Sequence, residues 1–450
     1  MASFSSLNTA LSAMRYQQIA LDIASTNVAN GGVDGYVRRR VIGETVGAGA
    51  VPALWSRSTQ LGAGVRASSV DRMIDPYLEV RGRAEHAKQS YLDLQAQALA
   101  RVETGLAEPG DHGLAAAISN FRSTLHDLSN HPDSSAARSQ VLEAAGTVAD
   151  AIRLQARNIA DETGDQQARL QATVAEVNTT AAQLAATNHS IAAASLSASD
   201  TANLLDERDR LAMKLAELTG ASAAVQPNGT MTVTLGTTPL VSGEASGVLT
   251  ATGSPTAFAV DGTAVSGTPG GAVGAIADLL DNVLPDYLAG LADVAKTFAD
   301  ELNTQHAAGY DRAGQPGGPL FTYDPADVAG TIAVAIDDPT KLAASSVASD
   351  QVLDTGNAGK LIDAITIDDA YQQLVSGFGT AVASAKRLAE NQRALTTQVD
   401  SSREQLAGVS LDEETVNMLS AQRAYEAAAR VMTTVDSMLD TLINRTGLVR

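Results

Sequence analysis

Residues 410–444 read SLDEETVNMLSAQRAYEAAARVMTTVDSMLDTLIN, and this stretch decides the fold of the chain's last part. Apolar residues recur in it at alternating intervals of three and four, the spacing of one seam along a coiled-coil helix. The stripe consists of Met418, Ala421, Tyr425, Ala428, Met432, Val435, Leu439 and Leu442. Ser410 and Glu413 form a capping box, in which each side chain accepts from the other residue's backbone amide. The pattern predicts a helix that packs along one face.

A narrower stripe with the same spacing runs through residues 4–28, before the helix-breaking Asn30-Gly31-Gly32. Its apolar members are Phe4, Leu7, Leu11, Met14, Leu21 and Val28. Burying these six side chains gains on the order of 10–15 kcal/mol, whereas ordering the backbone of this helix costs on the order of 25–50 kcal/mol. We therefore expect the terminal helices to be disordered in an isolated subunit and to order against each other and neighbouring subunits. A single intramolecular bundle that buries both stripes is the alternative.

The middle of the chain is mostly helical in pattern. Residues 84–219 predict helices with breaks near 109–110, 131–133 and 197–200, and residues 33–80 look irregular or extended. Residues 221–272 are rich in Thr, Gly and Val and alternate in polarity around an Asn228-Gly229 turn signal, as strands do. The pattern predicts helix again over 273–305, then a strand at 331–336 and a helix over 368–408. The fold class is mainly α with an inserted β domain: a long antiparallel helical bundle with paired terminal helices, plus a small outer β domain.

Composition excludes several classes of function. The chain has 450 residues, with 31 Lys+Arg against 51 Asp+Glu, for a net charge of −20. Such a chain has no basic excess with which to bind nucleic acid. It has no cysteine, so disulfides and thiolate metal sites are impossible. We expect neither a cleaved signal peptide nor a membrane-spanning helix, because no continuous apolar run of sufficient length is present.

Catalytic signatures are missing as well. There is no G-x-S-x-G, H-E-x-x-H or P-loop sequence, and the G-x-G at 62–64 lacks the third glycine of a dinucleotide site. The six histidines are scattered, which favours surface or capping roles over metal binding. The charged run at 206–210, DERDR, is interpreted as a solvated helix face with i,i+3 and i,i+4 pairs. Residues 311–315 lack the alternating oxygen ligands of a calcium loop. We expect no catalytic site, no metal and no cofactor.

Three groups of residues resemble a known family. Residues 25–30 (STNVAN) with 35–39 (GYVRR), and 421–444 at the other end, resemble the terminal motifs of flagellar rod, hook and hook-associated proteins. Residues 203–211 (NLLDERDRL), 302–321 and 409–414 (VSLDEE) resemble the first hook-associated protein family, FlgK, which forms the hook–filament junction. The sequence departs from the family at Arg38-Arg39, where Arg-Gln is usual. Its short β region indicates that a large outer domain of some relatives is absent.

The resemblance implies a domain division and an assembly surface. The domains are 1–35 with 409–450 as an inner core, 36–220 with 273–320 and 346–408 as an α-rich bundle, and 221–272 with 321–345 as an outer β-rich domain. The assembly interface would comprise both apolar stripes together with Asn30, Gly35 and Tyr36. The partners implied are other copies of the chain, the hook protein, a second junction protein of the hook-associated group and an export chaperone of the FlgN type.

The resemblance also implies a function. We expect a secreted structural subunit, exported by the flagellar type III apparatus, that forms an adaptor ring joining hook to filament and that filament assembly needs. A hook or distal-rod protein is the first alternative, although those proteins should lack the segments at 203–211 and 302–321. A peptidoglycan-remodelling enzyme with its site in the β insertion is a remote alternative, because the sequence offers no paired acids there.

Overall fold

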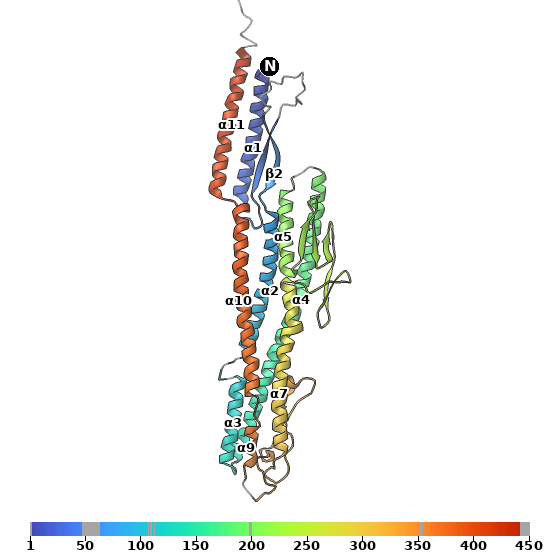
Figure 1. The fold of residues 1–450 in the computed structure, drawn as a ribbon, viewed down its shortest axis with the longest axis vertical. Helices are drawn as coiled ribbons and strands as arrows, with labels where there is room; N and C mark the ends of the chain where they lie inside the picture. Colours follow the sequence, from blue (N-terminus) through green and yellow to red (C-terminus); the bar gives the residue numbers. More distant parts are fainter. Residues whose placement is uncertain are drawn as a thin grey trace, which may run out of the picture.

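The computed structural model describes residues 2–46, 64–106, 108, 110–111, 113–197, 200–351 and 354–441. The molecule is a long rod of helices with small β-sheets on one flank (Figure 1). Helices α1 (Ala2–Asn30) and α11 (Leu411–Asp440) lie side by side at one end, and we call them the terminal pair. The other helices extend away from this pair and form the body of the molecule. The predicted mainly-α fold with an inserted β domain is confirmed.

Long helices build the body, and the predicted breaks fall between them. They are α2 (Pro76–Leu106), α3 (Leu114–Asn130), α4 (Ser135–Leu196), α5 (Ala202–Thr219), α6 (Gly271–Asp278), α7 (Leu284–Ala307), α9 (Gly356–Asp363) and α10 (Asp368–Ala407). A π-helical turn over Leu279–Val283 joins α6 to α7. The 62 residues of α4 give it a length of about 93 Å. Its first turn is capped by the Ser134 hydroxyl, which accepts from the Ala137 amide at 3.1 Å.

The inserted β region lies between α5 and α6 and packs on α4 (Figure 1). Its antiparallel strands form a four-stranded sheet and a three-stranded sheet. They are β3 (Ser222–Val225), β4 (Met231–Leu235), β5 (Thr238–Ser242), β6 (Ala245–Ser246), β7 (Leu249–Thr252), β8 (Ala257–Val260) and β9 (Thr263–Ala264). Asp261 and Gly262 have φ of 49° and 78°, as a two-residue turn with two left-handed positions requires. Strands therefore form where the alternation and turn signals predict them.

Two hydrophobic cores follow one another along the body. The core next to the terminal pair joins the second half of α4 to α5, α6 and the β region, with Leu184 and Met231 fully buried. The far core joins α3, α7, α9 and the first halves of α4 and α10 around Phe121 and Phe298, whose ring centroids are 6.1 Å apart. Both cores therefore share α4.

Residues 321–345, which we expected in the outer β domain, contribute side chains to the far core. Strands β10 (Phe321–Thr322) and β11 (Ala333–Val334) pair with each other, and α8 (Val328–Thr331) and a 3-10 turn (Pro339–Lys341) lie in the same segment. Phe321 and Leu342 are buried in the far core with α7, because their apolar side chains complete the end of the helical bundle. Only two residues of the predicted strand at 331–336 pair as a strand.

A β-hairpin packs on the terminal pair, although we expected its residues in the bundle. Strands β1 (Arg39–Thr45) and β2 (Val65–Arg72) are antiparallel, with a register shift at Ile42/Gly43, and both pack on α1. At Gly43 a Cβ atom would stand 3.0 Å from the Tyr16 ring, so glycine allows the strand to approach the helix. The hairpin, which lies beyond the boundary expected at residue 35, therefore packs on the first helix.

Leu125→Ala in α3 tests the far core. Leu125 is fully buried, so we expect its truncation to lower the free energy of unfolding by about 2–5 kcal/mol. Leu154→Ala in α4 is the matched control because its side chain is 52% exposed, and it should change stability by less than about 0.5 kcal/mol. Urea unfolding followed by circular dichroism measures both, and equal losses would contradict this description of the core.

Candidate functional site

The chain passes between the terminal pair and the body at three places, residues 31–38, 73–75 and 408–410, and these segments meet. The Arg38 amide donates to the Ala407 carbonyl at 2.9 Å, and the Met73 amide donates to the Arg38 carbonyl at 2.9 Å. We call this region the joint. Its polar side chains are Asn27, Tyr36, Arg38, Arg39, Arg72, Asp206, Asp209 and Glu414.

Asn27, in the last turns of α1, is the centre of the joint. Its side chain is 1% exposed. The Asn27 Oδ1 atom accepts from the Tyr36 hydroxyl at 2.8 Å and from the Arg39 amide at 3.0 Å. Its Nδ2 atom donates to the Arg39 carbonyl at 2.9 Å and to Glu414 Oε2 at 3.0 Å. One buried amide therefore ties the first helix, the start of the hairpin and the last helix together, with both of its polar atoms satisfied.

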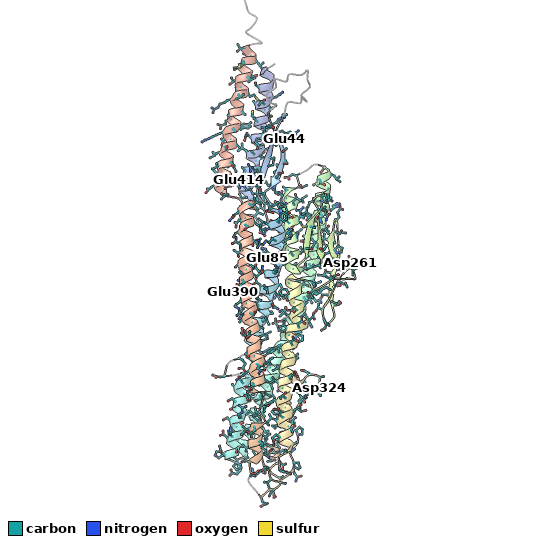
Figure 2. All side chains as sticks on the ribbon, viewed as in Figure 1. Glu44, Glu85, Asp261, Asp324, Glu390 and Glu414 are labelled. Atoms are coloured by element: carbon teal, nitrogen blue, oxygen red, sulfur yellow. The ribbon has the colours of Figure 1, made fainter. Side chains whose placement is uncertain are left out.

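Arg38 makes the second link to α11. Its Nε and Nη2 atoms lie 2.8 and 2.7 Å from Glu414 Oε1, and its Nη1 lies 2.8 Å from Glu413 Oε2. Glu414 is buried in the first turn of α11, the end next to the joint (Figure 2). The Ser410 hydroxyl accepts from the Glu413 amide at 3.4 Å, as the capping box predicts, but the Glu413 carboxylate pairs with Arg38 instead of turning back to Ser410. The arginine outcompetes the cap because it offers a charged donor.

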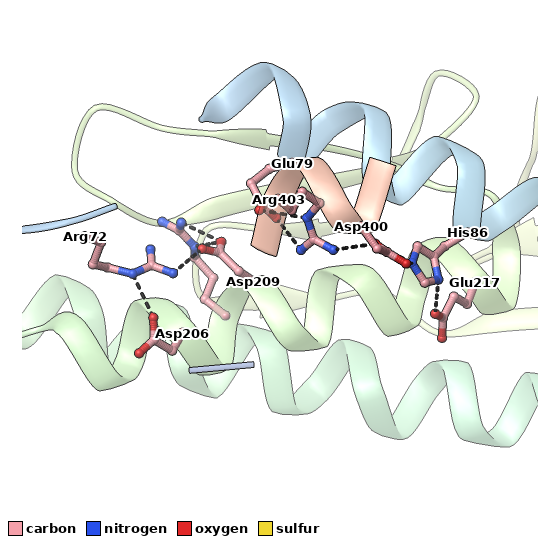
Figure 3. A network of polar contacts seen from close by, with 9 residues as sticks. Arg72, Glu79, His86, Asp206, Asp209, Glu217, Asp400 and Arg403 are labelled. Carbon is pink, nitrogen blue, oxygen red and sulfur yellow. Dashed lines mark hydrogen bonds and ion pairs between the residues drawn. The ribbon is translucent and has the colours of Figure 1, made fainter. Parts of the chain in front are cut away.

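Arg39 and Arg72 link the hairpin to α5. Arg39 Nη2 donates to Asp206 Oδ2 at 3.0 Å, Arg72 Nε donates to Asp206 Oδ1 at 2.8 Å, and Arg72 Nη2 donates to Asp209 Oδ2 at 2.7 Å. Figure 3 shows the Arg72 fork between the two aspartates. The interpretation of residues 206–210 as a solvated face is therefore wrong for Asp206 and Asp209, which are largely buried. The sequence run could not show that arginines far away in the chain cover this face.

The remainder of that charged run divides in two. Arg208 is buried, bonds the Asp209 carboxylate at 2.6 Å and donates to the Gly229 carbonyl in the turn between β3 and β4. Glu207 and Arg210 pair at 2.6 Å on the exposed face, as the i,i+3 spacing predicts. One side of α5 therefore binds the hairpin through Asp206 and Asp209, and the side that carries Glu207 and Arg210 faces solvent.

Burial shifts the pKa values of two acidic groups in the joint. Burial raises the pKa of the Asp206 carboxyl, although Arg72 and Arg39 act in the opposite direction. Burial likewise raises the pKa of Tyr36, whose hydroxyl stays protonated and donates to Asn27. The Arg39 guanidinium carbon lies 5.1 Å from the centroid of the Tyr36 ring, within the range of a cation–π contact. The attraction within a buried ion pair offsets little more than the free energy lost on desolvating the two charges. This network therefore fixes the geometry of the joint and adds little to its stability.

A groove of about 1040 Å³ opens beside the joint, between residues 31–38, α5 and the end of α10. A chain of ion pairs continues along it (Figure 3). Arg403 of α10 donates to Glu79 of α2 at 2.9 Å and to Asp400 at 3.1 Å, and Asp400 in turn meets His86. No group of three metal-ligating side chains occurs among the described residues. The groove thus carries charged contacts between helices.

The predicted assembly residues fall on the terminal pair. On α11, Ala421, Ala428 and Val435 are buried at intervals of seven, and the half-buried members of the stripe alternate with them along the helix. These are Met418, Tyr425, Met432 and Leu439. On α1, Leu7, Leu11, Met14 and Leu21 are half-buried, while Val28 is 37% exposed. The buried positions of α1 are Ala10, Ala24 and Asn27, because small side chains let the helices approach closely. The Phe4 side chain and Leu442 lie outside the described residues.

The other predicted residues around the joint have local roles. Asn30 ends α1 and donates to the Thr26 carbonyl at 3.0 Å. Gly35 has φ of 77°, which only glycine adopts readily, and it lies against the Arg210 side chain. Whether these residues contact neighbouring subunits stays a prediction.

The histidines divide into three environments. His306 is fully buried, with Nδ1 2.6 Å from the Gly318 carbonyl and Nε2 accepting from the Ala343 amide at 2.9 Å. Burial lowers the pKa of His306, so the predicted surface role is wrong for this residue. His86 is half-buried in the groove. The exposed histidines are His126, His131 and His189, while His112 and residues 62–63 of the G-x-G lie outside the described part of the chain. The Asp311 carboxylate accepts from the Ala313 and Gln315 amides as a turn does.

Models of flagellar protein families match the ends of the chain. Residues 7–36 match the flagella basal body rod protein family, and residues 405–445 match the C-terminal region of the basal body rod FlgEFG proteins. Together with the paired terminal helices, these matches place the chain in the class of axial flagellar proteins. In the part of the chain that the structure describes, no helix is long and apolar enough to cross a membrane.

The middle of the chain identifies the family. Residues 99–321 match the helical domain of the flagellar hook-associated protein FlgK. Flagellar hook-associated protein 1 of Bacillus subtilis is 30% identical, with 99% of each chain covered, and that of Escherichia coli is 26% identical over 97% of this chain and 99% of its own. The flagellar hook junction protein FlgK of Burkholderia pseudomallei has the same fold, with a TM-score of 0.64 and 18% identity over 73% of this chain and all of its own. The chain belongs to the FlgK family and is a structural protein of the bacterial flagellum.

Asn27→Ala tests the centre of the joint. The truncation leaves the buried Arg39 amide, Tyr36 hydroxyl and Glu414 carboxylate short of a partner, at about 1–3 kcal/mol for each unsatisfied group. We expect hydrogen exchange in residues 39–45 to become roughly tenfold faster or more. Asn30→Ala is the matched control, since it removes only the bond to the Thr26 carbonyl. If the two variants exchange at equal rates, Asn27 is not the centre of the joint.

Proposed function

We propose that this structural protein of the hook–filament junction assembles as a ring of identical subunits that joins the hook to the filament and that filament growth needs. The observation that supports it best is the paired terminal helices, held at a set angle on the body by the joint. An adaptor needs an inner part that continues the axial packing of its neighbours, and an outer part that keeps its own fold when the neighbours differ. The terminal pair and the body suit these two parts.

The outer face of α11 supports the proposal of self-assembly. Several of its apolar side chains are about half exposed or more in the single chain, Val416 at 65% and Met438 at 58% among them. Leu411, Leu419 and Val431 are also exposed. Apolar side chains that recur along one helix favour contact with another protein surface. Head-to-tail contacts between copies would bury them and would propagate into a ring.

We further propose a revised domain division and a set of partners. Residues 1–75 with 409–450 would form the inner core, residues 221–272 an outer β domain, and the remainder, including 321–345, the helical body. The hook protein would contact one side of the ring, and a second junction protein of the hook-associated group the other. Export by the flagellar type III apparatus would expose the face of α11 before assembly, and a chaperone of the FlgN type would cover it.

Deletion of the gene tests the proposed position in the flagellum. We expect cells with intact hooks and no filaments, and with flagellin released into the medium, because the filament would have no base on which to grow. Electron microscopy of the cells and an immunoblot of the spent medium measure both. Absent hooks would place the protein lower on the axis, in the rod or hook, and normal filaments would remove it from the axial structure.

Leu11→Asp and Leu439→Asp test the role of the terminal pair in assembly. Each places a charge at a half-buried position between α1 and α11, so we expect loss of incorporation and of motility while the body stays folded. Leu154→Asp in α4 is the control, because it adds the same charge at an exposed position of the body. Complementation of the deletion strain measures motility, and circular dichroism checks the fold. Normal motility of both terminal variants would contradict the proposal.

A further inference from the structure

His86 of α2 lies between two carboxylates that belong to two other helices. Its Nδ1 atom is 3.0 Å from Glu217 Oε1 in the last turn of α5, and its Nε2 atom is 3.0 Å from Asp400 Oδ2 in α10. Figure 3 shows the ring between these two side chains, with Arg403 bound to the same Asp400. The His86 side chain is 26% exposed, so solvent only partly screens the two contacts.

This geometry requires a doubly protonated ring. An ionised carboxylate only accepts hydrogen bonds, and a neutral imidazole carries a single N–H, so it can satisfy only one of the two partners. The imidazolium cation has an N–H on each nitrogen and can donate to both. Loss of its proton would turn one ring lone pair toward a carboxylate and would leave two negative side chains on either side of a neutral ring.

The charged groups around the ring leave this requirement in place. From α5, Glu217 and Lys214 face the groove, but the Lys214 ammonium pairs with Glu176 of α4. From α10, Asp400 contacts the ring, and Arg403 is held by Glu79 and Asp400. Asp209 of α5, Glu404 of α10 and Glu79 of α2 also line the groove.

These contacts shift the equilibrium of the ring toward its cation. The hydrogen bond to Glu217 and that to Asp400 raise the pKa of His86 above its usual value of 6.5, although burial acts in the opposite direction. The two carboxylates are the nearest partners of the ring; Lys214 is paired with Glu176, and Arg403 shares Asp400 with His86.

We propose that His86 is a pH-dependent latch that holds α5 and α10 against α2 beside the joint. When the ring is charged, it donates to a carboxylate on α5 and to one on α10, and so joins three helices next to the joint. When it loses its proton, the bridge opens on one side and the three helices separate more readily near the groove. The inference concerns the isolated chain and is independent of the proposed role at the junction.

The sign of the pH dependence follows from the raised pKa. A histidine whose pKa is higher in the folded chain than in the unfolded chain stabilises the fold through its charged form. This contribution is fully present below about pH 6.5, the unfolded value, and is lost as the pH rises through the folded pKa. The latch is therefore closed in mildly acidic solution and opens toward alkaline pH.

An NMR titration of the full chain tests the latch directly. With carbon-labelled histidine, the Cε1–Hε1 signals report each ring, and His86→Gln identifies its own signal by the one that disappears. We expect His86 to titrate above pH 6.5, because its ring lies between two carboxylates. A His86 pKa at or below 6.5 overturns the proposal.

Hydrogen exchange then tests whether the ring holds the helices. After correction for the intrinsic pH dependence of exchange, we expect protection of residues 76–90, 213–219 and 396–407 to fall several-fold between pH 6 and pH 8.5, while α3 stays unchanged. His86→Gln should show the lower protection at both pH values, and His189→Gln should behave as the parent chain does. Equal protection of the three segments at both pH values in the parent chain would overturn the latch.

Discussion

The buried hydrogen bonds of Asn27 are the interaction on which the rest of the structure depends. Asn27 lies in α1, and its side chain donates to the Arg39 carbonyl at the start of the hairpin and to Glu414 at the start of α11. One side chain therefore joins the first helix to the last. An amide is suited to this position, since it offers a donor and an acceptor and carries no charge that burial would penalise. The arginines that follow it then extend the contact outward, Arg38 to α11 and Arg39 to α5. Asn27, Arg38 and Arg39 lie close together in the chain, and their bonds to α11 and α5 set the angle between the terminal pair and the body.

The motif at residues 35–39 has a physical explanation in this arrangement. Gly35 supplies the left-handed turn after α1, and Tyr36 donates to Asn27. The successive arginines point to different helices because side chains alternate along an extended strand. The second basic residue is Arg39, where the resemblance of the sequence leads us to expect glutamine. Its guanidinium meets Asp206 in a buried pair, so this residue fixes the position of the hairpin on α5.

The helices and the inserted β region could be predicted from the sequence because their signals are local. Turn residues and the alternation of Met231, Val233 and Leu235 define strands without reference to other segments. The contents of the joint could not be predicted in this way. Asp206 belongs to a run of charges that looks solvated, and only the hairpin that covers it, more than a hundred residues earlier in the chain, makes it buried. Residues 321–345 show the same limit, since their two short strands resemble the β region locally, whereas β10 packs on α7 and β11 packs on α4.

Helix α4 gives the body a mechanical property that no single core would have. Its first half contributes Ile152 and Ile159 to the far core, and its second half contributes Val177 and Leu184 to the core beside the joint. Between them the backbone is one uninterrupted helix, with no loop that could absorb a rotation. Torsion applied to one core is therefore transmitted to the other along a single rod, and the body twists and bends as one elastic element.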